Sequence, residues 1–314
     1  MNGRQKGIAS ALISAVFLGL TPIFGKQAML FGFTPLAVVA IRSGLAVSLL
    51  FIFLLLFRRS FFYIYPLGFV GCALAGVVNG LGSILYYSAL SRLDASIGQL
   101  LYSFYPLFVA IWLFLDRQPL SRMTLIRLIL SVPGIFLLVG SSSKPVDLTG
   151  AGMMIGAAAL YALHLLINQR VLYEVPAPTV TFYTLLAMAV TVITAFLVFH
   201  PQLQPVGAIW WPLFSLGVIT FISRLTLFLG VKHLGGIQTA LLGLGELLIT
   251  VGLAITWLGE QLNLIQWIGA LMLGANLLLA AYDKALPQKR KGKGFLNWLN
   301  PPKVHLTDIP LQDQ

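Results

Sequence analysis

Ten long apolar runs occupy most of this 314-residue chain, and only isolated charged residues interrupt them. Residues 60–91, 95–115, 148–169 and 261–282 contain no Asp, Glu, Lys or Arg. About 20 apolar residues in an α-helix match the ~30 Å hydrocarbon core of a bilayer. Only 9% of the residues are charged and the mean hydropathy is +0.92, whereas a soluble domain carries about 25% charged residues. The runs also lack the period-two alternation of barrel strands. The sequence therefore predicts an all-α membrane protein.

We expect each run to form one transmembrane helix, because a backbone in lipid must satisfy its own hydrogen bonds. The first run follows Arg4 and Lys6, as in a signal peptide. It is too long for a signal-peptide core and no small-residue cleavage site follows, so we expect the helix to be retained. The ten predicted spans are 7–26, 35–57, 66–90, 96–116, 122–142, 148–173, 178–200, 208–230, 237–258 and 263–283.

The net charge is +11, and the Lys and Arg residues are distributed unevenly between the loops on the two sides of the membrane. With a cytoplasmic N-terminus, fifteen Lys and Arg residues fall on the cytoplasmic side, and only Lys26, Arg92 and Lys144 fall outside. This distribution follows the positive-inside rule. We therefore expect a protein of the cell (inner) membrane with both termini cytoplasmic, and no nucleic-acid partner. The fifteen residues are Arg4, Lys6, Arg58, Arg59, Arg117, Arg122, Arg127, Arg170, Lys232, Lys284, Lys289, Arg290, Lys291, Lys293 and Lys303.

The chain contains one unit twice. Residues 149–170 resemble 6–27, and residues 227–249 parallel 86–108 at an offset of about 141 residues. Each half contributes five spans, and because five is odd the halves cross the membrane in opposite senses. Such inverted repeats place a binding site near the bilayer midplane, where the halves meet. The predicted units are two five-helix repeats and a basic tail, at 1–143, 144–283 and 284–314.

The predicted tail has two interpretations. Its basic cluster is followed by Phe295, Leu296, Trp298 and Leu299, a pattern that can bind anionic lipid headgroups. It can also be a solvated tail whose charge fixes the topology.

Glu246 is the strongest candidate for a functional residue. It lies about ten residues into the span 237–258, close to mid-bilayer. Inserting an isolated acid there costs about 2.5–3.5 kcal/mol. The residue could bind a substrate ammonium group, couple transport to protons, or form a hydrogen bond between helices.

Two arginines also lie within spans. Arg224 could pair with Glu246, bind an anionic substrate group through its planar fork, or extend its side chain to the cytoplasm. Arg42 could lock helices together through backbone carbonyls or attract substrate. Arg127, near the cytoplasmic end of its span, is expected to reach the membrane surface.

Uncharged polar residues gather in the same spans. Gln99, Tyr102 and Tyr105 are spaced by three and share one helix face. His164 and Asn168 are four residues apart in 148–173. We expect these side chains to line a cavity for a small metabolite, although each alone is equally compatible with helix packing. The full set of candidate substrate-binding residues is Arg42, Asn79, Tyr86, Gln99, Tyr102, Tyr105, His164, Asn168, Arg224 and Glu246.

Several chemistries have no motif in this sequence. The single cysteine, Cys72, cannot form an internal disulfide. His164 has no second His, Cys or acid at metal-ligand spacing. There is no nucleotide-binding loop of the GxxxxGK[ST] type, no nucleophile elbow and no zinc motif. We therefore expect no cofactor, no metal, no enzymatic activity and no direct use of ATP.

A set of short motifs, in their order and spacing over residues 6–283, resembles the EamA-type family of the drug/metabolite transporter superfamily. The resemblance implies ten helices in two halves, with helices 1, 3, 4, 6, 8 and 9 around a cavity and helices 5 and 10 peripheral. Two departures are Leu-Asp-Arg at 115–117, where the family usually has Leu-Gly-Glu, and Leu247, where it often has Pro. The motifs are Pro35–Arg42 (PLAVVAIR), Tyr87–Leu90 with Ala95-Ser96, Tyr105-Pro106, Gly245-Glu246, and Leu258–Gln261 leading to Gln266–Gly269.

The leading functional expectation is a secondary transporter that moves small metabolites, such as amino acids or amphipathic compounds, by alternating access, and the expected direction is outward. Its expected partners are a small-molecule substrate, membrane lipid and, as a candidate coupling ion, the proton. Either a monomer or a homodimer is compatible with the sequence. The alternative is a membrane enzyme or flippase acting on lipid-linked substrates. An enzyme would need paired carboxylates at one interface, but Asp116 and Glu260 lie on opposite sides, and Asp94 and Asp147 have no clear partner.

Overall fold

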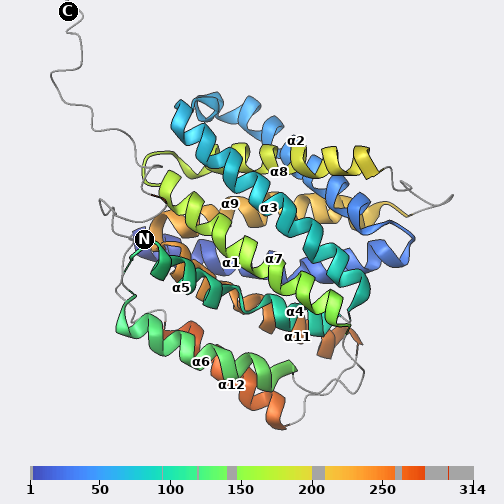
Figure 1. Ribbon diagram of the computed structural model, residues 1–314, viewed down its shortest axis with the longest axis vertical. Helices are drawn as coiled ribbons and strands as arrows, with labels where there is room; N and C mark the ends of the chain where they lie inside the picture. The colour runs from blue at the N-terminus through green and yellow to red at the C-terminus, as the bar shows by residue number, and fades with distance from the viewer. Residues whose placement is uncertain are drawn as a thin grey trace, which may run out of the picture.

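The computed structural model describes residues 3–93, 95–118, 120–139, 147–199, 209–258 and 264–279, together with Leu296. Within this part the chain is helical and contains no β-strand (Figure 1). The elements are α1 (Gly3–Leu30), α2 (Pro35–Phe57), the short 3₁₀ helix η1 (Arg59–Phe62), α3 (Pro66–Arg92), α4 (Ala95–Tyr102), α5 (Tyr105–Leu115), α6 (Arg122–Val139), α7 (Leu148–Val171), α8 (Ala177–Phe199), α9 (Trp211–Leu234), α10 (Gly236–Gly243), α11 (Gly245–Leu258) and α12 (Leu264–Leu279).

Parts of several predictions lie outside the described residues. These are the predicted span ends at 140–142, 200, 208, 263 and 280–283, the acids Asp94 and Glu260, and the tail 284–314 except for Leu296.

Six helices are each long and apolar enough to cross a bilayer, namely α1, α2, α3, α7, α8 and α9. They correspond to predicted spans 1, 2, 3, 6, 7 and 8. The other four spans are formed by α4 with α5, by α6, by α10 with α11, and by α12. The prediction of an all-α membrane protein with ten transmembrane helices in two inverted five-helix repeats is confirmed.

The fourth and ninth spans are broken, which corrects the expectation of continuous helices over 96–116 and 237–258. The fourth ends as α4 at Tyr102 and resumes as α5 at Tyr105. Pro106, in the first turn of α5, cannot donate to the carbonyl of Tyr102, so the helix must start anew there. The ninth breaks at Leu244, between two glycines that are weak helix formers.

The two halves interleave. Helix α1 packs along α9 and α3 packs along α7, and these are the two most extensive pairings (Figure 1). Helix α2 packs on α8 and α9, and α3 also packs on α8. Most helices thus bury their surface against the other half. Helices α6 and α12 pack on each other at the lower edge of the bundle in Figure 1.

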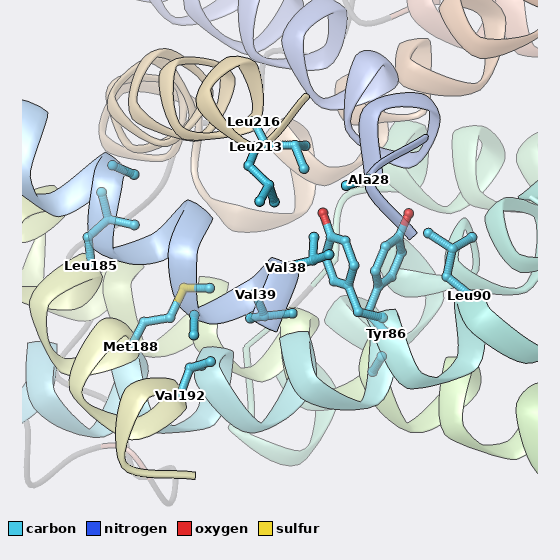
Figure 2. Close-up of a cluster of buried hydrophobic side chains, with 14 of the residues drawn as sticks. Ala28, Val38, Val39, Tyr86, Leu90, Leu185, Met188, Val192, Leu213 and Leu216 are labelled. Atoms are coloured by element: carbon cyan, nitrogen blue, oxygen red, sulfur yellow. The ribbon is translucent and has the colours of Figure 1, made fainter. Parts of the chain in front are cut away.

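Small residues allow close helix crossings in this bundle, as is usual in membranes. A Cβ atom at Gly76 of α3 would lie 2.6 Å from the Thr184 carbonyl oxygen of α8. The apolar core fills the space beside this crossing, where α2, α8 and α9 contribute branched and flexible side chains (Figure 2). The members labelled in Figure 2 are Ala28, Val38, Val39, Tyr86, Leu90, Leu185, Met188, Val192, Leu213 and Leu216.

Asp147 caps the N-terminus of α7. Its carboxylate accepts hydrogen bonds from the backbone N–H groups of Thr149 at 2.8 Å and Gly150 at 3.3 Å. It also lies 3.6 Å from the Arg92 guanidinium at the end of α3. The N–H group of Gly150, then that of Thr149 and then the nearby Arg92 charge hold the pKa of Asp147 below its usual value. The sequence had offered no partner for Asp147, and the structure provides Arg92.

At the other end of α7, Arg170 forms a fully buried ion pair with Asp116 at the end of α5. Asp116 also accepts hydrogen bonds from the Gln118 side chain at 2.8 Å and from the Leu296 backbone N–H at 3.1 Å. Asp116 is therefore a packed structural carboxylate.

Arg127 of α6 does not reach the membrane surface, contrary to the sequence expectation. Its side chain is fully buried and donates a hydrogen bond to the side-chain oxygen of Gln238 in α10. Gln238 on the neighbouring helix gives the guanidinium a polar partner inside the bundle, so the long side chain need not extend to water.

Candidate substrate site

A cavity lies inside the bundle, enclosed by α1, α2, α3, α4, α7, α9 and α11. Its volume is about 40 Å³, which is room for about three water molecules. Pockets that hold small ligands measure about 300–1,000 Å³. In this conformation the cavity is therefore too small to hold a drug-sized ligand. The lining residues are Leu18, Thr21, Arg42, Asn79, Gly82, Ser83, Tyr86, Tyr87, Gln99, Tyr102, Ala157, Tyr161, Arg224 and Glu246.

Glu246 enters the cavity from the first turn of α11. The carboxyl group is buried, Gln99 lines the same cavity, and the Oε1 atom of Glu246 has no hydrogen-bond partner. A carboxylate at a helix N-terminus is favoured by the helix dipole. Gly19 lets α1 approach closely here, because a Cβ there would lie 2.8 Å from the Glu246 carbonyl oxygen.

Arg224 extends from the middle of α9 and is buried. Its guanidinium contacts Nε2 of His164 at 3.4 Å and donates to Oδ1 of Asn79, also at 3.4 Å. It lies over the Tyr161 ring, 5.4 Å from the centroid. Its Nε atom has no hydrogen-bond partner. Of the three alternatives for Arg224, direct pairing with Glu246 is not formed here, since no ion pair within 4.0 Å joins these two described residues.

His164 supports Arg224 from behind the cavity wall. Its Nδ1 atom lies 2.6 Å from the Tyr161 carbonyl oxygen, which can only accept a hydrogen bond. Nδ1 therefore carries the proton, and Nε2 of the neutral ring is the acceptor that faces Arg224. The ring is fully buried.

Arg42 is the second guanidinium on the cavity. It donates to the hydroxyl groups of Thr220 at 3.2 Å and Ser83 at 3.3 Å. Its guanidinium carbon lies 4.8 Å from the centroid of the Tyr87 ring. Its Nε atom and the Tyr87 hydroxyl have no hydrogen-bond partner. One expectation was that Arg42 would hold helices together by donating to backbone carbonyl groups. In the structure it donates to side-chain hydroxyl groups instead.

A continuous group of tyrosines forms one wall. Tyr102 lies 4.8 Å from Tyr86 and 5.4 Å from Tyr161, measured between ring centroids. Tyr86 donates its hydroxyl to Gln99 at 3.2 Å. Tyr105 lies 5.0 Å from Tyr161 and donates to the Ala240 carbonyl at 3.0 Å. That last bond ties the break in the fourth span to the break in the ninth.

The structure brings most of the predicted residues to one cavity. Three of the predicted residues, Tyr105, His164 and Asn168, are not among those lining it. Asn168 accepts a hydrogen bond from Thr184 at 2.9 Å, which links α7 to α8. The predicted residues that do line the cavity are Arg42, Asn79, Tyr86, Gln99, Tyr102, Arg224 and Glu246.

Tyr86 and Tyr87, which end the third predicted span, were both expected to line the cavity and do so, whereas sequence reasoning missed other lining residues, chiefly Ser83 and Tyr161. Ser83 lies one helical turn after Asn79, and Tyr161 lies three residues before His164, so helical spacing could have indicated both.

The cavity combines two buried guanidinium groups with one buried carboxyl group. Each ion removed from water carries a penalty of several kcal/mol unless it is compensated. Such a site is suited to a ligand with opposite charges of its own. Among the described residues there is no group of three or more His, Cys, Asp or Glu that could hold a metal ion. Asp116 and Asp147 are paired with Arg170 and Arg92, respectively.

The paired five-helix repeats and the enclosed polar site between them define a multi-pass membrane protein that moves small molecules. The sequence profile of the EamA-like transporter family matches residues 5–140 and matches again at residues 148–282. The chain therefore belongs to the EamA-like transporter family, and it is a membrane transporter. This confirms the resemblance inferred from the short motifs.

Curated relatives agree with this assignment. The uncharacterized transporter YcbK of Bacillus subtilis is 25% identical over 282 residues, covering 84% of this chain and 88% of YcbK. The threonine/homoserine exporter RhtA of Escherichia coli K12 is 28% identical over 268 residues, covering 82% of this chain and 83% of RhtA. A solved crystal structure superposes with a TM-score of 0.73 at 17% identity, covering 89% of this chain and 97% of the other, and shows the same fold.

Proposed function

We propose that this transporter exports small amino acids or related amphipathic metabolites through the central cavity by alternating access. The observation that carries the proposal is the placement of Arg224 and Glu246. Both line one cavity, they do not pair with each other, and each has a polar atom without a hydrogen-bond partner. A substrate carboxylate would bind at Arg224, and its ammonium group would bind at Glu246. The name of the relative RhtA, a threonine/homoserine exporter, supports this class of substrate.

Contacts at the two ends of the bundle support alternating access. At the end where α7 begins, Lys26 donates to the carbonyl oxygens of Leu90 at 2.8 Å and Leu93 at 3.0 Å. The ion pair between Arg92 and Asp147 lies at the same end. Opening this end would break these contacts and expose the cavity on one side of the membrane.

The opposite end is closed by different contacts. Arg170 and Asp116 pair there, and the Gln169 side chain accepts a hydrogen bond from the Gly236 N–H at 2.7 Å. These two sets of contacts lie at opposite ends of α7. One end of the bundle can therefore open, by breaking its contacts, while the contacts at the other end remain intact.

The remaining parts of the proposal follow the charge pattern. The repeats comprise residues 1–143 and 144–283, with a basic tail at 284–314. Both termini lie in the cytoplasm, and the protein resides in the inner membrane as a monomer or homodimer. Glu246 is the candidate group for coupling to protons, because among the described residues it is the one carboxyl group that lines the cavity.

The test is flux of radiolabelled amino acids in proteoliposomes, comparing the native protein with Glu246→Gln. We expect the variant to fold normally and to lose flux by about tenfold or more. The exposed Glu174 gives a matched control, Glu174→Gln, which should retain flux. Normal flux with unchanged pH dependence in Glu246→Gln would remove this residue from the mechanism. Absence of flux for every amino acid tested would overturn the proposal.

A further inference from the structure

The cavity contains more positive than negative charge. Two guanidinium groups, Arg42 and Arg224, line it together with one carboxyl group, Glu246. The other described ionisable side chains of the lining are tyrosines, whose hydroxyl groups are neutral near pH 7. The site therefore has a charge of +1 when Glu246 is ionised and +2 when it is protonated.

No carboxylate of the described residues neutralises either guanidinium. Arg42 contacts the hydroxyl groups of Thr220 and Ser83, and Arg224 contacts His164 and Asn79, all of them uncharged in the arrangement above. Neither arginine has a described acid within 4.0 Å. Buried arginines are normally paired, so an anionic ligand is the missing component at both positions.

The spacing of the two arginines follows from the residues that hold them. Ser83, which binds Arg42, lies one turn beyond Asn79, which binds Arg224. Four residues of α-helix rise by about 6 Å. The two guanidinium groups thus bind at successive turns of α3 and line the same cavity, so the two acidic groups of one small ligand can reach both.

We infer, on the basis of the proposed function, that the substrate carries two acidic groups and one amino group, as an amino dicarboxylate does. One acidic group binds Arg224 and the ammonium group binds Glu246. The second acidic group binds Arg42, where the partnerless Tyr87 hydroxyl donates a further hydrogen bond. This ligand has a net charge of −1 and neutralises the site.

The inference makes Arg42 the residue that selects between acids and their amides. A side-chain amide has the same size as the carboxylate but no charge, so it would leave Arg42 buried without a counter-ion. Glutamate and glutamine, or aspartate and asparagine, are therefore matched ligand pairs. They differ only in the group that faces Arg42.

The experiment measures binding by thermal shift and exchange by proteoliposome counterflow, with full-length purified protein. The probes are L-glutamate, L-glutamine, L-aspartate, L-asparagine, L-threonine and succinate. We expect each acidic amino acid to bind at least about tenfold more tightly than its amide. Arg42→Gln should abolish the preference, and the exposed Arg59→Gln, a matched control, should keep it.

The outcomes separate this inference from the proposed function. If the amides and threonine bind as tightly as the acidic amino acids, or more tightly, the substrate does not need a second acidic group. That result would overturn this inference but not the proposed function. Succinate has two carboxylates but no amino group. If it binds as tightly as glutamate and aspartate, the two anion positions are supported, but the claim that the substrate carries an amino group is rejected. Binding of none of the probes would overturn both. If Arg42→Gln fails to fold, Arg42→Lys keeps the charge but loses the planar pair of N–H donors. This variant should keep the preference for the acids with weaker affinity, and unchanged affinity for every probe would contradict binding of the second acidic group at Arg42.

Discussion

At the residue scale, a neutral histidine orients the central arginine. His164 accepts from Arg224 because its other ring nitrogen is engaged by the Tyr161 carbonyl. A protonated ring would have no acceptor to offer and would place a second positive charge beside the guanidinium. The position of Arg224 in the cavity therefore depends on a residue that is not part of the cavity lining.

We predict that His164→Phe weakens substrate binding while the protein still folds, because phenylalanine fills the site but cannot accept from Arg224. A hydrogen bond to a charged group is worth about 1.5–3 kcal/mol, which corresponds to a loss of roughly 10–100-fold in affinity. Thermal-shift titration with the preferred substrate measures this change. His233→Phe is the matched control, because His233 lies near the end of α9 away from the cavity. Equal affinity in both variants would show that His164 does not position Arg224.

Much of the candidate site could be predicted from the sequence, because polar groups within apolar spans have a high energetic cost and are easily recognised. Arg42, Arg224 and Glu246 were found in this way. The aromatic members were harder to assign. Tyr102 and Tyr105 lie in the same predicted span and have the same chemistry, yet only Tyr102 lines the cavity. The difference depends on how the helices rotate and break, which a single sequence does not specify.

At the scale of elements, the breaks in the fourth and ninth spans determine how the site is built. The first break ends α4 after Tyr102, and the second places Glu246 at the start of α11. These breaks lie at corresponding positions of the two repeats. Tyr105 and Ala240 join them through one hydrogen bond across the bundle. Each broken span therefore presents a helix end near the centre of the membrane.

We predict that Gly243→Ala destabilises this junction, because an added Cβ would overlap the Tyr105 hydroxyl. Overpacking of this kind costs about 1–3 kcal/mol. The measurements are the melting temperature in detergent and transport, and both should fall. Gly152→Ala on α7 is the control, since a Cβ there has no atom within 4 Å. A melting temperature of Gly243→Ala equal to that of the control would contradict close packing at the junction.

The sequence predicted the number and order of the spans but not these breaks. Hydropathy reports how apolar a segment is, and 96–116 and 237–258 are apolar throughout their breaks. Pro106 and the pair Gly243 and Gly245 are residues of the types that can bend a membrane helix. Whether such residues bend or interrupt a membrane helix depends on neighbouring helices that can satisfy the released backbone groups. Here the Tyr105 hydroxyl supplies such a partner to Ala240.

At the scale of the whole molecule, membrane orientation follows from the distribution of charge. The proposed topology places the loop between α2 and α3 in the cytoplasm and the start of α7 outside. Ser60 and Leu148 are exposed in these two regions, and the native Cys72 is fully buried. These three positions allow a direct labelling experiment.

We predict that, in a Cys72→Ala background, Leu148→Cys reacts with a membrane-impermeant maleimide in intact cells. Ser60→Cys should react only after permeabilisation, because the positive-inside rule places it in the cytoplasm. Labelling is read as a gel shift, with the Cys72→Ala protein as the unlabelled control. The reverse pattern would mean that the chain is inserted in the opposite orientation.

The interleaving of the halves has a consequence for biogenesis. Synthesis proceeds from the N-terminus, so the ribosome delivers α1, α2 and α3 before α7 and α9 exist. During that interval Arg42 lacks Thr220, and Asn79 lacks Arg224. These polar groups must be sheltered by the insertion machinery, by water or by headgroups until the second repeat arrives. A nascent chain of this architecture is therefore most vulnerable to quality-control proteases when translation is half complete.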